Sequence, residues 1–138
     1  MLPSSPVLVT GATGWIGRRL VERLLDSGER PCAIGRTDAL GELPSGLQGG
    51  VVIHLAGLAH RRADASAPGA HAFSNGREPV RVGRLAAGQG VKRFVFVSTA
   101  AVMPASHRHP WRESDPPCPS DEYARAKLDA ERGLAELA

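Results

Sequence analysis

The amino-acid sequence predicts an α/β fold in which helices cover both faces of a parallel sheet. Short apolar runs alternate with segments of helical periodicity, which is typical of strand–helix–strand units with right-handed connections. The first apolar run leads directly into the glycine-rich stretch TGATGWIGRRL, residues 10–20. The length of 138 residues and the hydrophobic content of 42% suit a single packed domain. We therefore expect one doubly wound α/β domain over residues 1–138.

Four strands are expected, at residues 7–10, 31–34, 51–55 and 93–98. The continuous apolar character of the last run predicts a strand that is covered on both faces. Three helices are expected, at residues 16–25, 78–89 and 121–137. Gly28 is expected to end the first helix, and Asp121 or Ser120 to cap the last. Irregular structure is expected for residues 37–50, 60–76 and 104–120.

Composition and charge argue against several classes of function. The net charge of +3 is small and the arginines are interspersed with acidic residues, so the sequence indicates no nucleic-acid surface. The apolar runs are too short for a membrane span, and none has the flanks of a signal peptide. Cys32 and Cys118 form no CxxC pair and are expected to be free thiols. These features predict a cytoplasmic protein that binds neither nucleic acid nor membrane.

The three glycines of residues 10–20 occur at a strand-to-helix turn, where each has a separate use. Gly11 permits the tight turn, Gly14 lets a pyrophosphate approach the backbone, and Gly17 lets helix and strand pack closely. The free amides and the dipole of the helix would hold the phosphates. A merely structural turn is the alternative. The predicted phosphate site consists of Gly11, Thr13, Gly14, Trp15, Ile16 and Gly17.

The spacing G-x-x-G-x-x-G after a threonine resembles the short-chain dehydrogenase/reductase superfamily, and the resemblance continues along the chain. VVIHLAG, residues 51–57, is similar to a strand motif that lies beside the cofactor. Asn75 precedes GVKRFVFVSTAAV, which resembles the strand leading to the active-site serine or threonine. YARAK, residues 123–127, supplies the Tyr-x-x-x-Lys pair. The most similar branch is the NAD(P)-dependent epimerase/dehydratase family, with UDP-glucose 4-epimerases and 4-ketosugar reductases.

This resemblance implies a Rossmann-like domain that binds NAD or NADP, with Leu55, Ala56, Gly57 and Lys127 beside the cofactor. It also implies that Tyr123 is the acid/base, that Lys127 holds the nicotinamide ribose, and that Thr99 hydrogen-bonds the reacting oxygen. Ser98 is the alternative hydroxyl. Independently, Tyr123 and Lys127 are four residues apart on a predicted helix and would project from one face. A nearby ammonium favours the phenolate, although a solvated lysine on a helix surface is the alternative.

Some positions refine the predicted chemistry. Ala100 and Ala101 stand where the related sugar dehydratases carry an Asp-Glu pair, so we do not expect elimination of water. Arg36 follows the second predicted strand, and no acidic residue is present there to bind the ribose hydroxyls of NAD. Arg36 therefore favours NADP, unless it is simply an exposed arginine. The remaining candidates for a metal site, His107, His109 and Cys118, fit no zinc spacing, so no metal is expected.

The resemblance also implies parts that this sequence lacks. Relatives have a C-terminal part that grips the nucleotide sugar, and a strand and helix where this chain has only residues 37–50. We thus expect strand order 2-1-4-5 in the numbering of the family, with the C-terminal substrate part absent. The 138-residue chain is expected to bind cofactor weakly and to turn over no nucleotide sugar by itself. A homodimer through the last two helices is expected.

Three functions stay open at this point. The first is a nucleotide-sugar epimerase, or a nucleotide-sugar 4-ketoreductase, of which this chain is the cofactor-binding part. The second is a non-catalytic sensor that binds NAD(P), although a sensor has no need of Thr99, Tyr123 and Lys127. The third is a non-functional remnant, which is supported by the absence of the C-terminal part and of the strand and helix that relatives have in place of residues 37–50.

Overall fold

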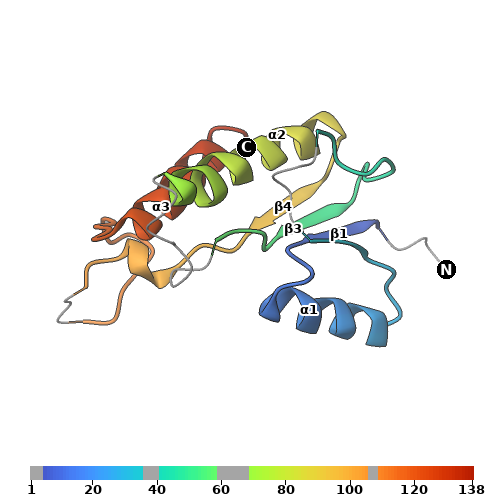
Figure 1. The fold of residues 1–138 in the computed structure, drawn as a ribbon, viewed down its shortest axis with the longest axis horizontal. Helices are drawn as coiled ribbons and strands as arrows, with labels where there is room; N and C mark the ends of the chain where they lie inside the picture. Colours follow the sequence, from blue (N-terminus) through green and yellow to red (C-terminus); the bar gives the residue numbers. More distant parts are fainter. Residues whose placement is uncertain (1–4, 36–40, 59–68, 106–108) are drawn as a thin grey trace.

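The computed structural model describes residues 5–35, 41–58, 69–105 and 109–138. The described strands, β1 (Val7–Thr10), β2 (Cys32–Ile34), β3 (Val51–His54) and β4 (Arg93–Phe96), form one parallel sheet of order β2-β1-β3-β4. The helix α1 (Trp15–Asp26) lies on one face of the sheet, and α2 (Glu78–Gly88) and α3 (Glu122–Ala135) lie on the other (Figure 1). The doubly wound α/β fold and the expected strand order are thus confirmed.

The strands end in register at one edge of the sheet. Thr10 at the end of β1 is paired with Ile34 of β2 and with His54 of β3, and His54 is paired with Phe96 of β4. The backbone leaving all four strands therefore emerges at the same edge. Ligands of open α/β sheets bind outside the carboxyl ends of the strands, so this edge is where a functional site is expected.

The first helix ends as expected from the sequence. Gly28 has a positive φ of 84°, a conformation that glycine adopts at little steric cost, and its amide donates to the carbonyl of Leu25 at 2.9 Å. One side of α1 packs mainly against β1, with Leu20, Val21 and Leu24 half-buried. Ile16, expected on this buried side, is 54% exposed. It lies in the first turn, beyond the end of β1.

A central cluster of buried apolar residues consists of Leu8, Leu43, Leu47, Val52, Val82 and Ala86. Two of its members come from the segment that was expected to be a loop. Residues 41–50 contain no helix or strand, as expected, yet Leu43 and Leu47 are 5% and 3% exposed. The side-chain amide of Gln89 donates to the Leu43 carbonyl at 3.1 Å. This segment therefore closes the core without regular secondary structure.

The prediction of irregular structure for residues 60–76 is wrong at its end. A π-helical turn, Ala72–Arg77, runs directly into α2. It buries Asn75 and Gly76 against α3, where a Cβ on Gly76 would lie 3.4 Å from the Ala126 carbonyl oxygen. Such π-helical turns hold a side chain out of the normal helical phase and are frequent at functional sites. The sequence analysis did not predict this helix because two glycines and a polar stretch interrupt its apolar period.

The helices α2 and α3 pack closely through glycines. A Cβ on Gly83 would lie 2.5 Å from a methyl of Leu134, and one on Gly133 would lie 2.7 Å from a methyl of Val80. The two helices thus cover part of each other's apolar faces within one chain. Among the described residues, none of the large exposed apolar side chains lies on α2 or α3.

The expectation that the strand of residues 93–98 is covered on both faces is wrong. On the side of α2 and α3, Phe94 and Phe96 are half-buried. On the opposite side Val95 and Val97 are 38% and 40% exposed, because α1 packs mainly against β1 at the middle of the sheet. Among the described strands β4 lies at the edge of the sheet, and one of its faces is open. None of the described helices is long and apolar enough to cross a membrane.

Candidate functional site

The glycine turn after β1 is packed directly against the backbone that follows β3. Gly11 has φ of 68°, and a Cβ there would lie 2.6 Å from the amide nitrogen of Ala56. Its own amide donates to the Gly35 carbonyl at 2.7 Å. A Cβ on Gly17 would overlap the Gly11 carbonyl oxygen and lie 2.7 Å from Cα of Ala12. The first and third glycines therefore serve turn geometry and close packing, as the motif predicts.

Gly14 differs from the other two glycines because it faces outward. It is the N-cap of α1, its extended backbone makes no side-chain cap hydrogen bond, and its amide donates to the Gly11 carbonyl at 2.9 Å. Thr13, Gly14, Trp15 and Ile16 are exposed, and Trp15 reaches 74%. The first turn of α1 has no acidic side chain. The N-terminus of α1 is thus open for an anionic group, which its dipole favours.

Thr10 connects the end of β1 to the segment after β3. Its hydroxyl oxygen accepts from the amides of Leu55 and Ala56, each at 3.2 Å, and lies 2.9 Å from Nδ1 of His54. With both acceptor positions used, the hydroxyl donates its proton to Nδ1, so the His54 proton lies on Nε2. Thr10 thereby fixes the backbone of residues 55–56 beneath the glycine turn.

His54 is buried at 1% exposure, between the ends of the strands and the rings of Phe94 and Phe96. Burial, followed by the ammonium of Lys127, lowers the pKa of His54 to about 4, while Glu78 opposes the shift. Among the described side chains its Nε2 is the one buried polar atom without a hydrogen-bond partner. His54 is therefore neutral at neutral pH and lies beneath the site.

We expect acid to destabilise the fold through His54. The unfolded state binds more protons between pH 6.5 and about 4, so the free energy of unfolding falls as the pH drops through this window. The full effect is about 3 kcal/mol. Urea unfolding between pH 7 and 4 measures it, and His54→Gln should flatten the slope while His109→Gln, at an exposed histidine, keeps it. A slope unchanged in His54→Gln would contradict this prediction.

The Tyr-x-x-x-Lys pair lies in the first turns of α3, which begins after the cap Asp121. The Asp121 carboxylate accepts from the Ala124 amide at 2.7 Å, so Asp121 and not Ser120 is the N-cap. Lys127 is only 8% exposed; its ammonium donates to the Val97 carbonyl at 2.9 Å and lies 4.6 Å from the centre of the Phe96 ring. Lys127 is therefore not a solvated surface lysine.

The electrostatics of Lys127 follow from this burial. Desolvation lowers its pKa to about 8, and the carboxylate of Glu131 opposes the shift. The ammonium faces Gly57, where a Cβ would come within 3.8 Å of Nζ. Lys127 thus reaches from α3 to the carboxyl ends of β3 and β4, close to the segment that packs on the glycine turn.

The side chain of Asn75 and its hydrogen-bond partners lie next to Gly57. The Asn75 side chain accepts from the Leu58 amide at 2.9 Å and donates to the Leu58 carbonyl at 3.0 Å. It also lies 2.9 Å from Nδ1 of His71, whose ring meets the ring of Tyr123 edge-on at 5.6 Å between centres. Asn75 therefore ties the Gly57 segment to the neighbourhood of Tyr123. The sequence analysis missed His71, whose only signal is its spacing of four residues from Asn75.

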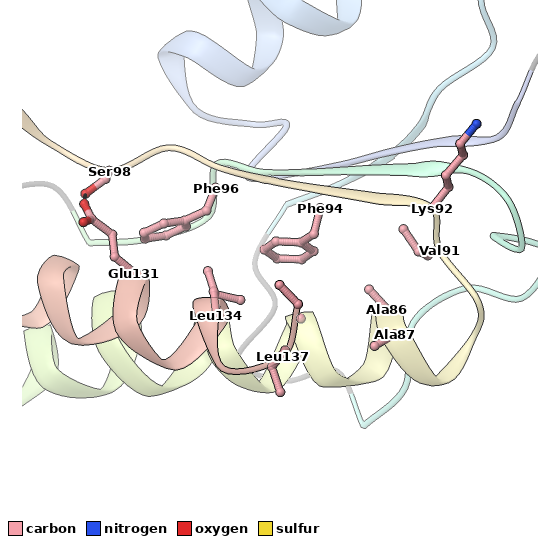
Figure 2. A pocket seen from close by; sticks show the side chains of 12 residues that line it. Ala86, Ala87, Val91, Lys92, Phe94, Phe96, Ser98, Glu131, Leu134 and Leu137 are labelled. Atoms are coloured by element: carbon pink, nitrogen blue, oxygen red, sulfur yellow. Dashed lines mark hydrogen bonds between the residues drawn. The ribbon is translucent and has the colours of Figure 1, made fainter. Parts of the chain in front are cut away.

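The two candidate hydroxyls after β4 have different partners. Ser98 donates to the carboxylate of Glu131, and both side chains point toward each other at the end of β4 (Figure 2). Thr99 is half-buried, and its hydroxyl accepts from the Ala101 amide at 3.2 Å as the cap of a short 3-10 helix, Ala100–Val102. Glu131 was also missed by the sequence analysis, although it is four residues beyond Lys127.

Other predicted site residues are placed less fully. Arg36, on which the preference for NADP rests, lies outside the described residues, as does His107. In the part of the chain that the structure describes, no group of three or more His, Cys, Asp or Glu side chains could hold a metal ion. The described site thus combines an open helix N-terminus, the 55–57 backbone and a buried lysine at one edge of the sheet.

Comparison with known proteins agrees with this arrangement. The sequence model of the NAD dependent epimerase/dehydratase family matches residues 7–138. The chain belongs to this family. Members of the epimerase/dehydratase family are NAD(P)-dependent enzymes, and the glycine turn and the Tyr-x-x-x-Lys pair of this chain both lie within the matched residues.

Individual relatives within the epimerase/dehydratase family differ in activity. The chain is 32% identical to a probable dTDP-4,6-dihydroxy-2-methyloxan-3-one 4-ketoreductase of Streptomyces antibioticus, over 92% of this chain and 45% of that protein. It is 30% identical to the UDP-glucose 4-epimerase of Vibrio cholerae, over 99% of this chain and 48% of that protein. The structure of MoeE5 in complex with UDP-glucose and NAD superposes with a TM-score of 0.80 at 27% identity, and the superposition covers 96% of this chain and 48% of the MoeE5 chain. The chain spans about half the length of the curated relatives it matches.

Proposed function

We propose that residues 7–138 are the cofactor-binding part of a nucleotide-sugar epimerase similar to UDP-glucose 4-epimerases. The observation that carries this proposal is the burial of Lys127 beside Gly57, four residues after Tyr123 and at the sheet edge where the glycine turn lies. A buried lysine is costly, and an enzyme that needs an ammonium next to an acid/base gives a reason to keep it.

The cofactor fits the open end of α1. The exposed first turn of α1 and Gly14 would hold the pyrophosphate, residues 55–57 would line the nicotinamide side, and Lys127 would reach the ribose. A bound nicotinamide supplies and accepts hydride at a sugar carbon. MoeE5 was solved with NAD, which supports a nicotinamide cofactor here. The preference for NADP rests on Arg36 alone and stays a prediction.

Proton transfer falls to residues of this chain. Tyr123 would remove or return the proton of the sugar hydroxyl, and Thr99 would hydrogen-bond the same oxygen. Because the pKa of Lys127 is about 8, its side chain is mostly protonated at pH 7 and would offer an ammonium one helical turn after Tyr123. Ser98 is the weaker candidate for the hydroxyl role because its proton is donated to Glu131.

A 4-ketoreductase is the second candidate, and the Streptomyces antibioticus relative favours it. Both activities use a proton transfer and a hydride transfer at the same carbon. An epimerase removes hydride and returns it after the ketosugar has rotated within the pocket, whereas a ketoreductase takes the ketosugar as its substrate and consumes reduced cofactor. Ala100 and Ala101 speak against dehydration in either case. Assays of the product of the full reading frame with UDP-glucose and with a dTDP-4-ketosugar separate epimerisation from reduction. Activity on neither substrate, in a protein that binds the cofactor, would favour a sensor.

We expect Gly14→Val to remove cofactor binding without unfolding the chain. The extended backbone of Gly14 (φ −74°, ψ 172°) accepts a β-branched residue, and an added Cβ would lie a tight 3.1 Å from the Gly11 carbonyl oxygen. The side chain would occupy the space through which a pyrophosphate approaches. Fluorescence of the exposed Trp15, in a Trp111→Phe background, measures NADH and NADPH binding.

The matched control is Gly41→Val, at an exposed position where an added Cβ meets none of the described residues within 4 Å. It should bind cofactor like the parent protein. Unchanged affinity in a folded Gly14→Val variant would show that the phosphate site is wrongly assigned.

A homodimer through α2 and α3 stays a prediction. The helices already pack on each other through Gly83 and Gly133, so a dimer would have to use their outer surfaces. Light scattering at high protein concentration tests it, and a monomer there would contradict it.

A further inference from the structure

The helix α3 holds the segment after β4 at two successive residues. Lys127 donates to the carbonyl of Val97 at 2.9 Å, and Glu131 accepts from the hydroxyl of Ser98. Lys127 and Glu131 are four residues apart on α3 and lie on the same face of the helix. Figure 2 shows Ser98 and Glu131 pointing toward each other beside Phe96. All three residues line a pocket of about 580 Å³.

These two contacts matter because the end of β4 has little other support. β4 is hydrogen-bonded to β3 alone among the described strands, and the last link, from the Val97 amide to the His54 carbonyl, is long at 3.5 Å. Thr99 follows immediately and begins the 3-10 helix. The place of Thr99 relative to Tyr123 and Lys127 on α3 therefore depends on the clamp formed by Lys127 and Glu131, together with the packing of the 3-10 helix on α3.

Glu131 also bears on the charge of Lys127. Two charged or titratable groups interact with this ammonium, Glu131 of α3 itself and His54 of β3, and Glu78 at the start of α2 acts on His54. His54 is neutral, and Glu78 is engaged with Arg81 in a bidentate contact at 2.7 and 2.9 Å. The Glu131 carboxylate is the group that opposes the loss of the Lys127 proton on burial.

We propose that Glu131 is a positioning residue for the proton-transfer site. Its carboxylate anchors Ser98, which fixes the strand end that carries Thr99, and it lies one helical turn from Lys127, whose ammonium holds the preceding residue of that strand end. The inference rests on the proposed function for its catalytic meaning, but the anchor and the charge are properties of the folded chain by itself. They can therefore be tested without turnover.

The sequence provides an internal standard for this test. It contains two lysines, Lys127 and the exposed Lys92. Competitive labelling with acetic anhydride, read by mass spectrometry across pH 6–10, gives the reactivity of Lys127 relative to Lys92 in the same molecules. Hydrogen–deuterium exchange of residues 97–102 reports the anchor separately.

Two variants separate the two roles of Glu131. Glu131→Gln keeps an acceptor for Ser98 but removes the charge, so labelling of Lys127 at pH 7 should rise roughly 3- to 10-fold while exchange of residues 97–102 stays slow. Ser98→Ala keeps the carboxylate but removes the bond, so exchange should become faster while Lys127 labelling changes less than about twofold. Glu136→Gln, an exposed glutamate on the same helix end, should match the parent protein in both.

Two results would overturn the inference: Lys127 labelling in folded Glu131→Gln equal to the parent, or unchanged exchange of residues 97–102 in Ser98→Ala. If Glu131→Gln did not fold, Ser98→Ala would still test the anchor. Adding NADH or NADPH to the parent protein should protect Lys127 and not Lys92. If NADH and NADPH left the labelling of Lys127 unchanged, that result alone would reject the proposed function and leave the role of Glu131 standing.

Discussion

A Gly17→Ala substitution is expected to unfold the chain, although alanine is the better helix former. In an unconstrained helix the change from glycine to alanine stabilises by about 1 kcal/mol. At Gly17 the added methyl would overlap the carbonyl oxygen of Gly11 and lie 2.7 Å from Cα of Ala12, both of which are backbone atoms that cannot rotate away. Relief requires α1 to separate from the turn after β1. We expect a net loss of about 3 kcal/mol or more, typical of overpacking against rigid neighbours.

Gly88→Ala is the matched control, since Gly88 ends α2 and, within the part of the chain that the structure describes, an added Cβ there meets nothing within 4 Å. It should be neutral or slightly stabilising. Urea unfolding followed by circular dichroism compares the two variants. A Gly17→Ala variant as stable as Gly88→Ala would mean that the turn does not require its third glycine.

Tyr123→Phe is expected to lower turnover by ~10²-fold or more in the full-length protein. The substitution keeps the ring that meets His71 edge-on, so the packing at the start of α3 is retained. It removes the hydroxyl that we propose as the acid/base. Lys127 keeps its contact with the Val97 carbonyl, so cofactor binding should persist.

The controls for this variant are direct. Trp15 fluorescence should give the same cofactor affinity before and after the change. Because Tyr123 is the single tyrosine of the chain, its loss is also verified by the disappearance of all phenolate absorbance at high pH. Retained turnover in Tyr123→Phe would reject the proton-transfer role, and loss of cofactor binding would place Tyr123 in the binding site instead.

The parts of the molecule that sequence analysis predicted have local causes or follow from the family resemblance. The glycine spacing fixed the turn between β1 and α1, because each glycine meets backbone within a few residues or in the neighbouring strand. The strand order followed from the family resemblance, and the sheet confirms it. The Tyr123 and Lys127 pair came from the same resemblance, and its spacing of four residues within α3 agrees with the prediction of one helix face.

The features that sequence analysis missed depend on contacts between distant segments. Leu43 and Leu47 show no period, and only the folded chain brings them against β1, β3 and α2. Glu131 reads as an ordinary charged residue on a helix until Ser98 is placed beside it. The exposure of Val95 and Val97 depends on which helices reach the outer strand. The apolar run of residues 94–97 cannot predict this, because it reflects only the local sequence.

The segment of residues 41–50 has a consequence for how the domain can be cut and rejoined. Surface connections in α/β domains usually tolerate new termini, insertions and proteolytic nicks. Here Leu43 and Leu47 belong to the same cluster as Leu8 and Val52, so the connection is part of the cooperative unit. A circular permutant opened within it should lose cohesion between β1 and β3. The exposed connection after Gly28, where no buried side chain lies before β2, is the better place to open the chain.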